Sequence, residues 1–216
     1  MDVASRVGYW SSLAALTATA AFLIVQLMQL LGWLHFPFDE ILIYATSLLI
    51  PIPFLLAMLS LHYCTPPKKK LWSHAALLFA GIYVVFVVAN YVVQLATVIP
   101  AKLSGKTDAI QVLEQTPHSL FWDYDAIGYI FMGISTLFAV PSVKHEGAGK
   151  WLRISFLANA GATPFISIVY FSQNYSERLL LLGLAWAITA PFFMFRLAVY
   201  FRTIKIAETE ASEGSA

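Results

Sequence analysis

The chain has 216 residues, of which 59% are hydrophobic and only 12% are charged, and its mean hydropathy is +0.73. Soluble domains carry roughly 25% charged residues, so this composition excludes a soluble domain and indicates an integral membrane protein. The net charge of +1 argues against a nucleic-acid partner, which would require a basic surface. The single cysteine, Cys64, excludes an intrachain disulfide and a cysteine-based metal cluster.

Six apolar segments are each long enough to cross a bilayer, which takes about 20 residues for roughly 30 Å of hydrocarbon. Lipid offers no hydrogen-bond partners, so such segments must be helices that satisfy their own backbone. The sequence therefore predicts an all-α fold: a polytopic membrane helix bundle with six transmembrane helices, multi-pass in the cell membrane. The predicted spans are residues 8–34, 40–62, 72–99, 119–142, 151–171 and 179–201.

Prolines and polar stretches divide the chain further. Each proline inside a span removes a backbone hydrogen bond and predicts a kink. In the long connection 101–117, apolar residues predict one or two helical turns on the membrane surface, followed by Thr116 and Pro117 as N-cap and first residue of span four. We expect one transmembrane domain over 1–206 and a disordered acidic tail over 207–216. The prolines are Pro51, Pro53, Pro164 and Pro191.

The basic residues predict the orientation, because cytoplasmic loops carry an excess of Lys and Arg. With the N-terminus inside, ten basic residues fall on the cytoplasmic side and three on the other, namely Lys102, Lys106 and Arg178. Both termini are therefore predicted to be cytoplasmic.

Polar side chains gather in the outer third of the predicted bundle. Gln26 and Gln29 share one face of span one, and Asn90 and Gln94 share one face of span three, because helical residues three or four apart are neighbours. Span four begins near His118 and contains Asp123 and Asp125, which point about 200° apart, so at most one faces the interior. His118 and Asp125 are seven residues apart on one face. The predicted ligand-binding residues are Asp125, Gln26, Gln29, Asn90, Gln94 and His118.

Two other interpretations of these polar residues stay open. Amides in membrane spans often only bind neighbouring helices, and a carboxylate near a helix N-terminus is stabilised by the helix dipole. No metal site is predicted, because no ligand-spacing motif supports one from His35, Asp39, Glu40, His118 and Asp125. No cofactor is predicted either, since His62 and His74 flank a cytoplasmic loop rather than lying within spans as haem ligands do.

In length and layout the chain resembles an uncharacterised six-span prokaryotic integral membrane protein family, a domain of unknown function. The stretches that carry the resemblance are 49–54, 90–94 and 125–133. The resemblance implies a six-span fold and supplies no catalytic residues.

Three functions follow as hypotheses. The first is a protein that binds or transports a small molecule, an ion or a lipid through a polar pocket in the extracytoplasmic half, with Asp125 as its charged anchor. The second is a non-catalytic membrane scaffold or complex subunit, whose partner is a second copy or another membrane subunit. The third is an intramembrane lipid-modifying enzyme with His118 and Asp125 as acid and base. We predict no catalytic residues, because no established catalytic motif occurs.

Overall fold

The computed structural model describes residues 3–108 and 110–213 of the chain. The fold is all-helical, with 82% of the chain in helices and no strand in the described part. Six helical segments are long and apolar enough to cross a membrane, which confirms the six-span prediction and indicates a membrane protein. These segments are Val3–Leu30, Phe38–Tyr63, Pro67–Leu103, Leu120–Ser142, Gly147–Phe171 and Arg178–Ile204.

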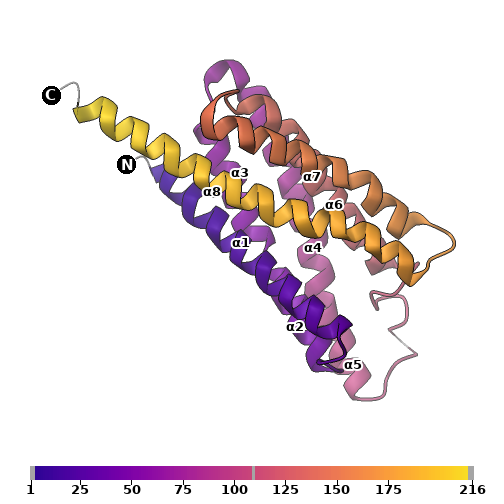
Figure 1. Cartoon of the computed structure of the whole chain (residues 1–216). Coiled ribbons are helices and arrows are strands. Elements are labelled where there is room, and N and C mark those ends of the chain that lie inside the picture. The colour runs from indigo at the N-terminus through magenta and orange to yellow at the C-terminus, as the bar shows by residue number, and fades with distance from the viewer. Residues whose placement is uncertain (1–2, 109, 214–216) are drawn as a thin grey trace.

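The helices follow the predicted spans in chain order (Figure 1). Short helical turns, labelled η, precede or follow several of them. The α-helices are α1 (Val3–Leu30), α2 (Phe38–Leu48), α3 (Pro51–Tyr63), α4 (Lys70–Val93), α5 (Ile99–Leu103), α6 (Leu120–Ala139), α7 (Gly147–Phe171) and α8 (Leu184–Glu213).

Proline accounts for the division of the second span. The span is interrupted at Leu49 and Ile50, directly before Pro51 and Pro53, because proline cannot donate to the preceding turn and clashes with it. By contrast, α7 and α8 continue as helices through Pro164 and Pro191. The sequence predicted a kink at these prolines, and the structure has an interruption in the second span. The kinks predicted at Pro164 and Pro191 stay predictions.

The third span changes its helical pitch near its end. Residues Gln94–Val98 form a π-helical turn, labelled η2, between α4 and α5. Pro100 follows, and its missing N–H disturbs the regular hydrogen-bond pattern. Such turns often lie at functional sites, and this one positions the side chain of Gln94.

The six spans form a closed ring, in which each packs against its neighbours in sequence and α8 returns to α1. α1 and α8 run antiparallel, since Thr19 Oγ1 donates to Met194 Sδ over 3.2 Å and the rings of Phe22 and Trp186 lie 5.9 Å apart. Toward the end away from the termini the two helices diverge (Figure 1).

The core fills the middle of this ring with aromatic side chains. The ring of Phe54 lies 5.5 Å from that of Tyr83 and 5.8 Å from that of Phe193, and the Phe193 ring lies 5.9 Å from that of Phe156. All four residues are buried. The bundle is therefore solid at mid-depth.

Both termini lie at one end of the bundle, together with the α3–α4 and α6–α7 connections (Figure 1). Their cytoplasmic placement stays a prediction. α8 continues to Glu213 within the predicted acidic tail, and residues 214–216 lie outside the described part, so the disorder of 207–216 also stays a prediction.

Candidate functional site

A cavity of about 280 Å³ lies in the half of the ring away from the termini. It occupies the space where α1 and α8 diverge, and residues of α2, α4, α6 and α7 complete its wall. The volume is near the lower limit of roughly 300–1,000 Å³ for small-molecule pockets. Its polar wall residues are Gln26, Tyr44, Ser47, Tyr91, Gln115, Asp125, Tyr129, Tyr170 and Trp186.

The start of α6 sets the direction of its carboxylates. The N-cap is Ser119, whose Oγ accepts from the Trp122 N–H over 3.2 Å, so the helix begins at Leu120. The prediction that Thr116 and Pro117 begin this helix is therefore wrong by three residues. Asp125 is 3% exposed and lines the cavity, whereas Asp123 is half-buried and lies outside it. The choice of Asp125 as the inward carboxylate is confirmed.

Three donors surround the Asp125 carboxylate. Oδ1 accepts from Asn90 Nδ2 over 3.1 Å and from the Tyr91 hydroxyl over 2.9 Å. Oδ2 accepts from the Tyr170 hydroxyl over 2.5 Å. The Tyr91 hydroxyl uses its own proton toward Asp125, so it accepts from the Tyr129 hydroxyl, 2.9 Å away. Side chains of α4, α6 and α7 are thus joined at one buried carboxylate.

No cation accompanies Asp125 among the side chains that the structure describes. The ion pairs among the described side chains involve Lys102, which binds Glu40 over 2.7 Å and Glu114 over 2.8 Å. A buried carboxylate without an opposite charge is costly, because hydrogen bonds replace only part of the lost hydration. The site therefore places a buried carboxyl group, without a cation to pair with it, beside an open volume.

Aromatic rings make up much of the cavity wall. The rings of Tyr129 and Trp186 meet edge to face with centroids 4.8 Å apart, and those of Tyr44 and Tyr91 lie 5.9 Å apart. Phe22 and Tyr170 also line the wall. Aliphatic side chains cover the remainder, including Leu23, Ile43, Ile166, Leu180 and Leu184.

Two polar side chains in the wall have no hydrogen-bond partner among the described residues. They are Ser47, whose Oγ is buried, and Trp186, whose indole Nε1–H is buried. Trp186 as a whole is 8% exposed. Buried polar groups are usually paired, so each unpaired group calls for an explanation. Both groups belong to the same cavity as Asp125.

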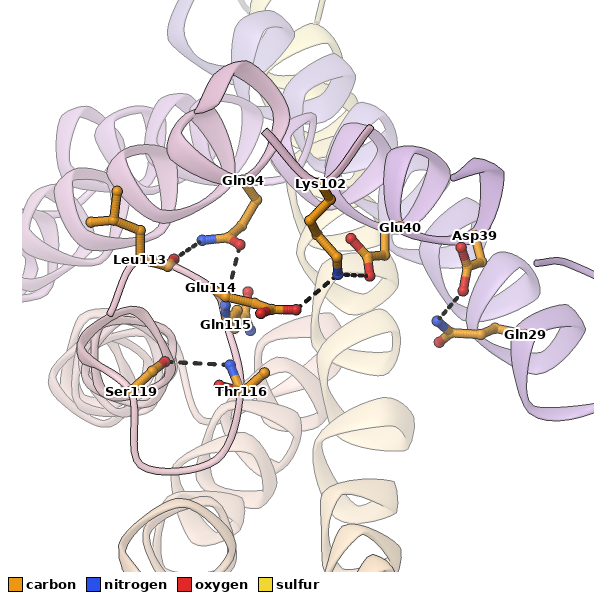
Figure 2. Close-up of polar contacts among 10 residues, drawn as sticks. All are labelled: Gln29, Asp39, Glu40, Gln94, Lys102, Leu113, Glu114, Gln115, Thr116 and Ser119. Carbon is orange, nitrogen blue, oxygen red and sulfur yellow. Dashed lines mark hydrogen bonds and ion pairs between the residues drawn. The ribbon is translucent and has the colours of Figure 1, made fainter. Parts of the chain in front are cut away.

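The connection between α5 and α6 lies beside the cavity and is held from two sides (Figure 2). Gln94 donates to the Leu113 carbonyl over 2.7 Å and accepts from the Gln115 N–H over 3.2 Å. Lys102 links Glu114 of the connection to Glu40 of α2. These contacts place Gln115 in the cavity wall, where its Oε1 accepts from Asn90 Nδ2 over 3.0 Å. The described residues of the connection form hydrogen-bonded turns, in which the Ile110 carbonyl accepts from the Leu113 and Glu114 N–H groups, and no helix. The helical turns expected on the membrane surface stay a prediction.

The structure brings together some of the predicted site residues and separates others. Asn90 and Gln94 are both fully buried, and Asn90 binds Asp125 directly. Gln26 lines the cavity, but its Nε2 donates to Gln29 Oε1 over 3.0 Å rather than to Asp125. The ligand-binding role of these residues stays a prediction.

Gln29 and His118 differ from the expectation. Gln29 turns away from Asp125 and donates to Asp39 Oδ2 over 3.1 Å (Figure 2). His118 is exposed with φ 69°, precedes the helix and lies outside the cavity wall. The shared face inferred for His118 and Asp125 was wrong, because the helix begins after His118.

The wall contains functional candidates that sequence reasoning missed: Tyr44, Tyr91, Tyr129, Tyr170 and Trp186. A signal existed for one of them, since Tyr129 is four residues after Asp125 and shares its face. Tyr170 and Trp186 belong to other helices, and nothing in their local sequence places them beside Asp125.

Comparison with family models, with curated proteins and with solved structures finds no match to this chain. The resemblance to a six-span prokaryotic family stays a prediction.

Proposed function

We propose that this protein binds a small molecule in the cavity beside Asp125, in the extracytoplasmic half of a bundle in the cell membrane. One observation carries the proposal: a buried carboxylate without a cation lines an open volume of about 280 Å³. Transport of the same molecule across the membrane would extend this function. The lipid bilayer surrounds the protein.

The arrangement supports binding over a purely structural role for Asp125. Asn90 and Gln94 are fully buried and bonded to neighbouring elements, as residues that join helices should be. A carboxylate is costly in lipid and is usually retained for function. The scaffold alternative accounts for the amides but leaves the cavity and the unpaired Ser47 and Trp186 groups without a purpose.

The enzyme alternative receives less support from the geometry. It requires His118 and Asp125 to act on one substrate, but His118 is exposed outside the cavity wall while Asp125 is buried within it. The remaining wall side chains near Asp125 are phenols, an indole and amides.

A cavity-filling substitution tests the proposal. Gly183 lines the cavity, and a Cβ built there meets no atom within 4 Å, so Gly183→Leu reduces the volume without a backbone clash. Native mass spectrometry of protein purified in mild detergent should detect a bound molecule on wild type and at least tenfold less on Gly183→Leu, because the ligand and the new side chain occupy one space.

Gly161→Leu is the matched control. Gly161 lies on α7, is exposed, also has no atom within 4 Å of a Cβ, and is outside the cavity wall. It should retain the bound molecule at the wild-type level. Equal occupancy in both variants, or an empty wild type that gains no ligand from a membrane extract, would reject the proposed binding function.

A further inference from the structure

The cavity has two chemically different parts. At one part, Asp125 contributes a buried carboxyl group that accepts from three neutral donors and that no described cation accompanies. The rest is mostly apolar, with aromatic rings and with leucines of α1, η4 (Glu177–Gly183) and α8 in the wall. A ligand that fits both parts carries a positive head and an apolar body.

The aromatic side chains favour a positive head of a particular kind. Six aromatic residues line the wall: Phe22, Tyr44, Tyr91, Tyr129, Tyr170 and Trp186. The faces of aromatic rings attract cations, tryptophan most strongly, and cages of such rings recognise alkylated ammonium groups. A carboxylate together with such rings matches an organic ammonium ion.

A bare metal ion fits this site poorly. Metal ions need several oxygen ligands, whereas the hydroxyls of Tyr91 and Tyr170 and the amide of Asn90 direct protons at Asp125. No group of three or more His, Cys, Asp or Glu side chains suited to a metal occurs among the described residues. The volume also exceeds the space of a single ion.

We infer that the ligand is an amphipathic organic cation, an amine or quaternary ammonium compound, with its charged nitrogen at Asp125 and its apolar body along the leucines. This inference rests on the proposed function and specifies its ligand class. A neutral or anionic ligand would leave the carboxylate without an opposite charge.

Matched probes test the inference by isothermal titration calorimetry on protein in lipid nanodiscs, with empty nanodiscs subtracted. The probes are phenylbutyl-trimethylammonium, its neutral isostere with a quaternary carbon in place of nitrogen, phenylbutyl-sulfonate, and sodium and potassium chloride. We expect the ammonium compound to bind at least about tenfold more tightly than its isostere, because only the cation pairs with Asp125. The sulfonate and the salts should show no saturable binding.

Three variants locate the interaction. Asp125→Asn should remove the preference for the cation, whereas Asp123→Asn, on the half-buried carboxylate of the same helix, should leave it unchanged. Trp186→Leu keeps Asp125 intact and removes the best cation-binding ring, so affinity for the ammonium compound should fall about threefold or more while that for the isostere changes little. The Trp186→Leu variant keeps the test informative if Asp125→Asn fails to fold.

The outcomes separate this inference from the proposed function. Equal binding of cation and isostere, insensitive to Asp125→Asn but lost in Gly183→Leu, would overturn the ammonium ligand and retain the binding cavity. Stronger binding of sulfonate, or of the simple salts, would overturn it as well. Absence of binding for every probe would overturn the inference, while the copurified ligand on wild type and its loss in Gly183→Leu still decide the proposed function.

Discussion

The Asp125 carboxylate is the main polar group of the cavity. Its donors come from α4 and α7, so the charge that a ligand would meet also connects two helices. Direct donors and relayed donors differ in energy, because a hydrogen bond to a charged group stabilises by about 1.5–3 kcal/mol and one between neutral groups by about 0.5–1.5 kcal/mol.

This difference predicts a ranking of two conservative substitutions. Tyr170→Phe removes a direct donor to Asp125 Oδ2 and should lower the free energy of unfolding by about 1.5–3 kcal/mol. Tyr129→Phe removes only the bond to the Tyr91 hydroxyl, and the expected loss is about 0.5–1.5 kcal/mol. Denaturant unfolding in detergent measures both. Equal or reversed losses would show that the Tyr170 hydroxyl is not the stronger partner.

The residues of the site were partly predictable, for a physical reason. Helical spacing within one segment relates residues on one face, and this placed Asp125 inward and paired Asn90 with Gln94. Spacing says nothing about which distant helix lies opposite, so Tyr170 and Trp186 could not be found. Helix starts are uncertain by a few residues, and that uncertainty misplaced His118.

At the scale of the elements, α6 is held closely against both its neighbours by glycines. A Cβ at Gly128 would overlap the Val87 side chain of α4, and a Cβ at Gly133 would overlap Thr163 Oγ1 of α7. Small residues let membrane helices approach closely, which is the main source of their packing energy. These two contacts fix the distance at which Asp125 meets its donors.

Gly133→Ala should therefore destabilise the bundle by about 1–3 kcal/mol, because the added methyl group must displace α7 or rotate Thr163. Thermal unfolding of the purified variant, with its midpoint compared with wild type, measures the effect. Gly161→Ala, which meets open space, is the matched control and should unfold near the wild-type temperature.

A second variant identifies the contact responsible. Thr163 Oγ1 has no partner among the described residues, so Thr163→Ala removes the overlapping atom without breaking a described hydrogen bond. Gly133→Ala combined with Thr163→Ala should recover part of the lost stability. If the double variant is no more stable than Gly133→Ala alone, the overlap lies elsewhere.

At the scale of the whole molecule, the sequence predicted the number, limits and helical nature of the spans, because lipid permits few alternatives to long apolar helices. It also predicted a kink at Pro51, directly before which the structure interrupts the second span. The sequence did not predict the ring order of the helices or the cavity, since both depend on side-chain packing between segments distant in the chain.

The predicted orientation is open to a labelling test. In a Cys64→Ser background, Ser104→Cys places an exposed thiol at the cavity end of the bundle, and His145→Cys places one in the α6–α7 connection. With cytoplasmic termini, a membrane-impermeant maleimide should label Ser104→Cys in intact cells and His145→Cys only after permeabilisation. The opposite labelling pattern would reverse the topology and place the cavity on the cytoplasmic side.

The buried aromatic core at mid-depth separates the cavity from the end of the bundle that holds the termini. A molecule bound in the cavity meets this core before the far end of the bundle, so binding alone would not carry it across the membrane. Passage to the other side would require the rings of Phe54 and Phe193 to separate from their present 5.8 Å. Both rings follow prolines closely, Pro53 and Pro191, where the helices lack a backbone hydrogen bond and bend most easily. A transport cycle, the extension of the proposed binding function, would begin with the separation of these two rings.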